Sequence, residues 1–163
     1  MGMIPGKLYA TIEKRLRERD TAPAKARRAV EAARERAMAI STPGTSSGGS
    51  GKKSTPGNSR VERAAVLIAM AEWNVEILGK WEEVFRKIDE IFPADSTNEG
   101  FVASLMYGNG MSQEEVCRFT GCARQTIRRR RDRYVNYVAL LAASEGLITR
   151  EEMIDHGDTD PED

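Results

Sequence analysis

The sequence predicts an all-α protein, in which a basic helical arm precedes a long amphipathic helix and a helix-turn-helix. Apolar residues recur at steps of three or four positions through the charged segments, which is the spacing of amphipathic helices. No run alternates apolar and polar residues in the manner of a strand. Four Ser/Thr-x-x-Glu capping boxes also mark helix starts where the apolar pattern requires them, and they begin at Ser59, Ser96, Ser112 and Thr149.

The charges of the chain are segregated, although its formal net charge is zero. Residues 1–60 hold 13 Lys/Arg against 5 Asp/Glu, and residues 101–138 hold 7 against 3, so both blocks are basic. Residues 61–100 hold 4 Lys/Arg against 9 Asp/Glu, and residues 139–163 hold 1 against 8, so both are acidic. Alternating blocks of this kind predict a basic surface that faces a polyanion, together with an acidic tail.

Residues 1–40 are predicted to form two basic helices. The first, over residues 7–19, has a thin apolar stripe that consists of Leu8, Ile12 and Leu16. The second, over residues 22–40, is rich in alanine and arginine and has a weak apolar face, so it needs a partner helix or a second subunit. Two interpretations of this arm stay open: it lies on nucleic-acid phosphates, or it is a solvated charged surface.

A long helix over residues 60–93 is predicted to follow a flexible linker, residues 41–59, in which Ser, Gly and Pro dominate. Its apolar seam consists of Val61, Ala64, Ile68, Ala71, Val75, Leu78, Phe85, Ile88 and Phe92. Trp73 and Trp81 lie off this seam and are expected to widen the apolar face. Such a seam packs against another helix, so we expect either oligomerisation through it or an antiparallel hairpin with the N-terminal helices.

Residues 96–144 are predicted to form a helix-turn-helix. Short helices over residues 100–107 and 113–119 precede a third helix, and Gly121 stands where the sharp turn needs an unusual backbone. The expected core contacts of the last two helices are Val116, Phe119, Ile127, Tyr134, Val138 and Leu141. The remaining residues, 145–163, are predicted to form a short acidic helix and a tail.

The third helix of this unit is strongly basic and is the candidate site for double-stranded DNA. The candidate DNA-binding residues are Arg124, Gln125, Thr126, Arg128, Arg129, Arg130, Arg131 and Arg133. Helical geometry points Gln125, Arg128, Arg129 and Asp132 away from the core, while Arg130 and Arg131 lie nearer its edge. Arginine can bond guanine in a bidentate manner and glutamine can bond adenine, so outward residues are expected to read bases. The competing interpretation is a solvated basic helix.

The segment GMSQEEVCRFTGCARQTIRRR resembles region 4 of sigma factors, with matching positions at Glu115, Val116, Cys117, Gly121, Thr126 and Ile127. Ala123 departs from that pattern, because it replaces the serine that caps the recognition helix. The wider layout resembles the RinA/ArpU-type transcriptional regulators of phages and prophages. The resemblance implies a sequence-specific regulator that activates late phage genes in the cytoplasm of a bacterial host. The long helix is expected either to form a homodimer or higher oligomer or to brace the protein, and RNA polymerase is a further candidate partner.

Two other classes of protein fit part of the pattern. One is a small terminase subunit that recognises DNA for packaging, and the other is a helical assembly or adaptor protein whose arginines bind an acidic protein. An enzyme, a cofactor or a metal site is not expected, because the only histidine, His156, lies in the acidic tail and Cys117 and Cys122 lack further ligands. No apolar run approaches the ~20 residues of a membrane span, so we expect a cytoplasmic protein.

Overall fold

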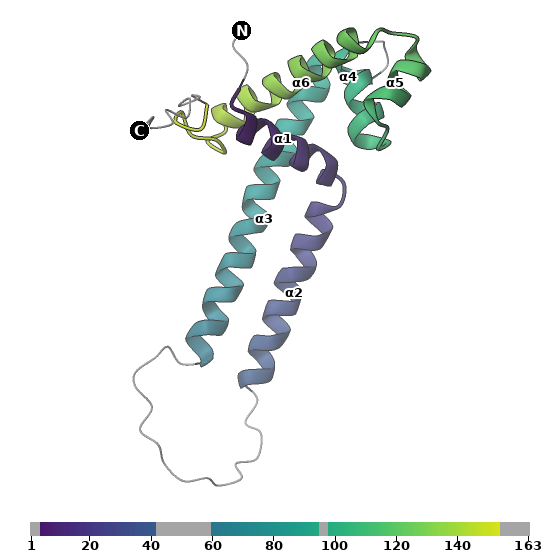
Figure 1. Cartoon of the computed structure of the whole chain (residues 1–163). Helices are drawn as coiled ribbons and strands as arrows, with labels where there is room; N and C mark the ends of the chain where they lie inside the picture. The colour runs from purple at the N-terminus through teal and green to yellow at the C-terminus, as the bar shows by residue number, and fades with distance from the viewer. Residues whose placement is uncertain (1–3, 42–59, 95–97, 154–163) are drawn as a thin grey trace, which may run out of the picture. The chain divides into compact units, whose positions relative to one another are not determined.

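The computed structural model describes residues 4–41, 60–94 and 98–153, and these residues form only helices and turns (Figure 1). The predicted all-α fold class is thereby confirmed. The predicted linker lies almost wholly outside the described residues. In chain order the elements are α1 (Gly6–Glu18), α2 (Ala22–Ser41), α3 (Arg60–Ile91), α4 (Glu99–Ala103), the π-helical turn η1 (Ser104–Gly108), α5 (Gln113–Thr120) and α6 (Arg124–Ser144).

The chain divides into two compact units that do not follow the predicted segments. The helix-turn-helix unit consists of Met1–Asp20 and Lys80–Asp163, and the hairpin unit consists of Thr21–Gly79. The predicted N-terminal arm is therefore split, because α1 belongs with the helix-turn-helix and α2 does not. Helix α3 contributes its first part to the hairpin unit and its last part to the helix-turn-helix unit.

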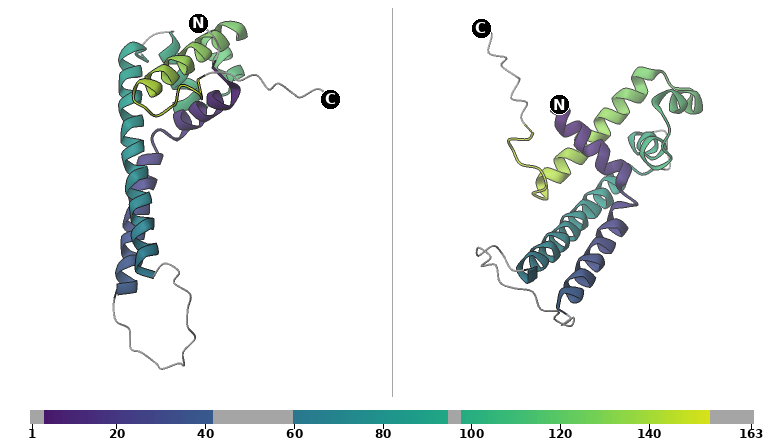
Figure 2. Two further views of the ribbon diagram at one scale, coloured as in Figure 1. Left: turned by 90° about the vertical axis from the view of Figure 1, so that its left-hand side faces the viewer. Right: turned by 60° about the horizontal axis from the view of Figure 1, so that its bottom comes forward.

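The core of the helix-turn-helix unit draws on helices from both ends of the chain. Its largest fully buried side chains are Ile12, Val84, Ile88, Val102, Val116, Ile127, Val135 and Val138. Figure 2 shows α1 crossing α6, which brings the start of the chain onto the helix-turn-helix. Polar contacts hold α1 in place, since Tyr107 Oη donates to Glu13 Oε1 at 2.9 Å and Arg19 donates to Asp89 on α3.

The hairpin unit pairs α2 with the first part of α3 in antiparallel directions (Figures 1 and 2). Arg34 on α2 and Glu72 on α3 form an ion pair of 2.7 Å. Of the two predicted packing arrangements, the antiparallel hairpin is the one present within a single chain. The expectation that Trp73 widens the packed face is wrong, because Trp73 is 65% exposed. At ~100° per residue it lies on the opposite side of α3 from Ala64, which is buried.

The helix starts agree only in part with the predicted capping boxes. Ser59 and Ser96 lie outside the described residues, and α4 is capped instead by Asn98, whose Oδ1 accepts from the amide of Phe101 at 3.1 Å. The Thr149 box does form, with Thr149 N 2.7 Å from Glu152 Oε2. However, the chain from residue 145 to 153 forms turns, so the predicted C-terminal helix is wrong over these residues.

Candidate nucleic-acid interface

The turn between α5 and α6 is built from local backbone chemistry. Ser112 and Glu115 form a complete capping box, with Ser112 N donating to Glu115 Oε2 at 2.7 Å and Glu115 N donating to Ser112 Oγ at 3.3 Å. The backbone amide and the hydroxyl of Ser112 both donate to the Glu115 carboxylate, and these two hydrogen bonds lower the pKa of Glu115. At the other end of α5, Gly121 adopts a left-handed conformation with φ of 67°. Glycine reaches this conformation without a Cβ clash, so the chain turns sharply into α6, as predicted.

A small apolar cluster joins the helices of this motif. It consists of Val102, Leu105, Val116 and Ile127. Phe119, which was expected in the core, is 65% exposed, and its ring centroid lies 6.4 Å from that of Phe101. The prediction that Phe119 belongs to the core is therefore wrong.

The first turn of α6 is anchored from α5 rather than by a cap of its own. Ala123 occupies the N-cap position and makes no side-chain hydrogen bond. The sequence predicted this, because alanine replaces the capping serine of the sigma-factor pattern. The amide of Gln113, at the start of α5, instead donates from Nε2 to the carbonyl oxygen of Arg124 at 3.0 Å. This hydrogen bond ties the starts of both helices together. The amide groups of the first turn of α6 have no cap side chain to satisfy them.

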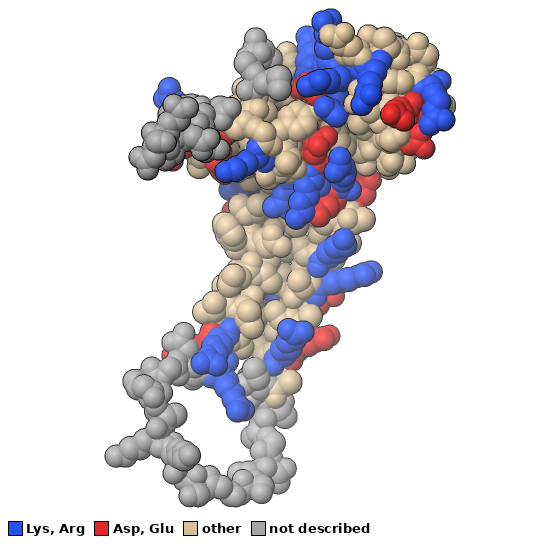
Figure 3. All heavy atoms as spheres, in the orientation of Figure 1, with Lys and Arg blue, Asp and Glu red and all other residues tan. Residues whose placement is uncertain are grey.

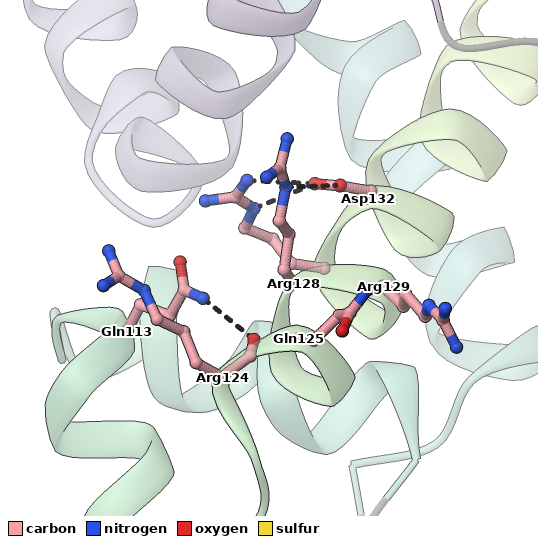
Figure 4. Close-up of a pocket in the computed structure, with 7 residues that line it drawn as sticks. Gln113, Arg124, Gln125, Arg128, Arg129 and Asp132 are labelled. Atoms are coloured by element: carbon pink, nitrogen blue, oxygen red, sulfur yellow. Dashed lines mark hydrogen bonds and ion pairs between the residues drawn. The ribbon is translucent and has the colours of Figure 1, made fainter.

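A hollow of ≈ 680 Å³ lies where α5 meets the first half of α6. Its lining residues are Gln113, Arg124, Gln125, Arg128, Arg129, Arg131 and Asp132 (Figure 4). Figure 4 shows Arg124 beside Gln113 on one side, whereas Gln125 and Arg129 project together to the other. Four of the predicted arginines therefore surround one surface, together with both glutamines.

Asp132 lies at the inner wall of this hollow and organises the arginines around it. Its Oδ1 accepts from Tyr9 Oη at 2.7 Å and from Arg131 at 3.0 Å, while Oδ2 lies 3.6 Å from Arg128 Nε. The Arg131 guanidinium also lies 5.5 Å from the centroid of the Tyr9 ring. Asp132 was predicted to point away from the core, and it is half-buried rather than exposed because Tyr9 on α1 contacts this side of α6. Burial and the hydrogen bond to Asp132 raise the pKa of Tyr9.

The other predicted site residues have different surroundings. Arg130 and Arg131 are half-buried, in agreement with their predicted place near the core edge. Arg130 Nη1 lies 3.9 Å from Cys122 Sγ, and Arg133 Nη1 forms a 3.2 Å ion pair with Glu99 on α4. Thr126 is exposed at the start of α6 but does not line the hollow.

The positive charge at this surface is only partly neutralised. In the view of Figure 3, Lys and Arg side chains gather where α6 meets α5. Two arginines form ion pairs with Asp132. Of these, Arg128 is the more exposed, with 63% of its side chain accessible to solvent. Arg124 and Arg129 form no ion pair with any residue that the structure describes. Exposed, unpaired guanidinium groups at a helix start are suited to binding phosphate or the edges of bases.

Two residues of this surface were missed by sequence reasoning. Gln113 directly follows Ser112, the N-cap of α5. This position at the start of the middle helix could have indicated that Gln113 lies beside the start of α6. Tyr9 had no such signal, because its role depends on α1 crossing α6, and its partner Asp132 is 123 residues away in the chain.

Comparisons with models of protein families, with curated proteins and with solved structures found no match for this chain. No helix in the described part is long and apolar enough to cross a membrane. Among the same residues, no three His, Cys, Asp or Glu side chains are grouped in a way that could hold a metal ion.

Proposed function

We propose that this protein binds double-stranded DNA through the first half of α6 and regulates transcription. The observation that carries the proposal is the hollow at the α5–α6 junction, with Arg124, Gln125, Arg128 and Arg129 exposed around it. These residues occupy the first two turns of the second helix of a helix-turn-helix. In that motif the N-terminal residues of the second helix contact base edges in the major groove.

The side chains suit two kinds of contact with DNA. Gln125 and Arg129, which project together, have the hydrogen-bonding groups that pair with adenine and guanine edges. Arg124 and Arg128, on the side toward Gln113 and α1, are placed for phosphates that border the groove. The N-terminus of α6 adds a partial positive charge that favours a phosphate near the exposed hydroxyl of Thr126.

We assign the remaining arginines to support of the reading surface. Arg131 is half-buried between Asp132 and the ring of Tyr9, and its contacts fix the inner wall of the hollow. Arg133 is paired with Glu99, so part of its charge is already compensated. Both therefore contribute less to DNA affinity than Arg128 and Arg129.

The regulatory role rests on the resemblance of residues 110–130 to sigma factor region 4 and of the wider layout to RinA/ArpU-type regulators. On that basis we propose activation of phage or prophage late genes, with a contact to RNA polymerase. A packaging protein would bind DNA with the same chemistry but would recognise a different site.

Pull-down of genomic fragments with the purified full chain, followed by sequencing, tests this function. We expect enrichment of one or a few promoter regions. Enrichment of a single packaging site would identify a terminase-like role instead. Recovery of no fragment above background at ~50 mM salt, where charge contacts are strong, would overturn DNA binding altogether.

A further inference from the structure

Helix α3 carries two separate apolar stripes within the hairpin unit. The inner stripe lines the groove with α2 and includes Ala64, Leu67 and Ala71. The outer stripe consists of Val66, Met70, Trp73 and Ile77, and ~100° per residue places these four within a sector of about 60°, whose centre is turned by roughly 120° from the inner stripe. Val66, Met70 and Trp73 are 52%, 62% and 65% exposed, so α2 does not cover this stripe.

The hairpin unit buries little apolar surface without a further partner. Its buried hydrophobic residues, among those described, are Ala26, Ala64 and Leu78. Alanine side chains on both helices line the groove between α2 and α3, and they are too small to give a large core. Two helices joined in this way are marginal by themselves, because most helix stability in proteins comes from packing of an apolar face.

We propose that the outer stripe binds the outer stripe of a second copy of this chain, with the two α3 helices antiparallel. The steps between the four residues are four, three and four, which is the heptad spacing of a helix-packing seam. This spacing reads the same in both directions about a midpoint between Ala71 and Glu72. A two-fold axis at that midpoint places Val66 against Ile77 and Met70 against Trp73 of the other copy.

The chemistry of the paired positions also matches. Two β-branched residues meet at each end, and a methionine meets a tryptophan at the centre, where sulfur–aromatic contacts are favourable. Glu62 and Lys80 lie along one edge of the stripe, at similar distances on either side of the midpoint. In the antiparallel pair this edge lies against the same edge of the other copy, so each Glu62 lies near the partner's Lys80, whereas a parallel pair would separate these two charges.

The area of the stripe is in the range that a dimer needs. Val66, Met70 and Trp73 are more than half exposed, and with Ile77 the four stripe side chains present on the order of 400 Å² of apolar surface. Flanking side chains extend this toward the roughly 600–800 Å² that each partner contributes to a stable interface. A patch of this size on one helix is typical of an interaction site.

The dimer does not depend on the proposed function, although it would give a DNA-binding protein two reading helices for two half-sites. Its test uses the full chain without DNA, so that failure of DNA binding and failure of dimerisation are separate results. Sedimentation equilibrium of the wild type between about 1 and 100 µM is expected to give twice the chain mass of 18.1 kDa.

The variant Met70→Glu/Trp73→Glu is expected to sediment as a monomer, because four charges would meet at the centre of the pair. Val66→Lys serves as a second variant and is expected to raise the dimer dissociation constant at least tenfold. Val61→Glu is the matched control, since Val61 is 61% exposed but lies off the stripe, and it should leave the mass unchanged. Circular dichroism checks that each variant keeps its helices.

Three results would overturn the inference: a wild-type monomer at 100 µM, a dimer that survives the stripe variants, or a dimer that Val61→Glu disrupts equally. If the double variant loses its helices, the test uses Val66→Lys instead. An unchanged dimer dissociation constant in that variant would overturn the inference.

Discussion

Gly100 is the residue at which the helix-turn-helix unit has least room. It lies in the first turn of α4, and a Cβ built there would overlap the carbonyl oxygen of Phe92 at the end of α3. Because that neighbour is backbone, it cannot move aside as a flexible side chain would. We predict that Gly100→Ala destabilises the protein by roughly 1–3 kcal/mol, which is the range for overpacking. Thermal unfolding should register this as a melting temperature lower by several degrees.

Gly79→Ala is the matched control for that substitution. Gly79 lies inside α3, and a Cβ added there would meet nothing within 4 Å. Alanine favours the helix by roughly 0.5–1 kcal/mol over glycine, so this variant should melt higher than the wild type. A Gly100→Ala variant that melts at or above the wild-type temperature would show that the close approach of α4 to α3 is wrong.

The N-cap of α6 is a second position at which a single substitution is expected to change the stability of the protein. Ala123 has N-cap geometry but no oxygen with which to accept a hydrogen bond. Ala123→Ser is therefore expected to stabilise the protein by about 1 kcal/mol, as serine caps do. Ser112→Ala removes the cap of α5 and should cost a similar amount. Urea unfolding measures both changes, and a stability loss in Ala123→Ser would contradict the cap assignment.

Single residues also mark where sequence reasoning succeeds and where it stops. The left-handed Gly121 and the Ser112 box follow from local chemistry, and the sequence predicted both. The predictions for Phe119 and Asp132 differ from the structure because exposure depends on what the rest of the chain covers. Phe119 is exposed, and Tyr9 on α1 covers part of Asp132. Helical periodicity gives the face of a residue but not what covers that face.

At the scale of elements, α1 is the least expected part of the helix-turn-helix unit. Its apolar stripe was predicted, but its partners were not, because a helix of this kind packs on any complementary apolar face. Ile12 is fully buried in the core that α6 shares. We predict that Ile12→Ala costs roughly 2–5 kcal/mol, the range for such buried truncations.

Hydrogen exchange gives the more specific readout of that substitution. If α1 braces the reading helix, backbone amides of α6 near Val135 should exchange faster in Ile12→Ala than in the wild type. Ile91→Ala is the matched control, because Ile91 is 48% exposed at the end of α3. Unchanged exchange in α6 would mean that α1 does not stabilise it.

The bounds of the helices were easier to predict from the sequence than the way the helices are divided between the two units. The bounds of α1, α2, α3 and α5 lie within one or two residues of the predicted ranges, because capping and apolar spacing are local signals. The division of α3 between two units was not predictable, since one continuous apolar pattern runs through it. The π-helical turn η1 has no signal that we recognise in the sequence.

At the scale of the whole molecule, zero net charge conceals a basic surface where α6 meets α5. The hollow beside α6 gathers four arginines, of which Arg124 and Arg129 carry no ion pair within the described chain. Helix α2 offers a competing basic surface, with Arg27 and Arg28 exposed side by side in the sequence. The two surfaces lie in different units, so their contributions to DNA affinity can be separated by mutation.

The most direct measurement is the affinity of Arg128→Ala/Arg129→Ala for an enriched DNA fragment, by fluorescence anisotropy over a series of salt concentrations. The control is Arg27→Ala/Arg28→Ala, which removes the same charge from α2. We predict at least a 30-fold loss for the α6 variant and a salt slope lower by about one or two, since base and phosphate contacts are both removed. The control should lose less than about threefold. Equal losses in the two variants, or a folded α6 variant that keeps its affinity, would contradict the assignment of α6 as the DNA-reading helix.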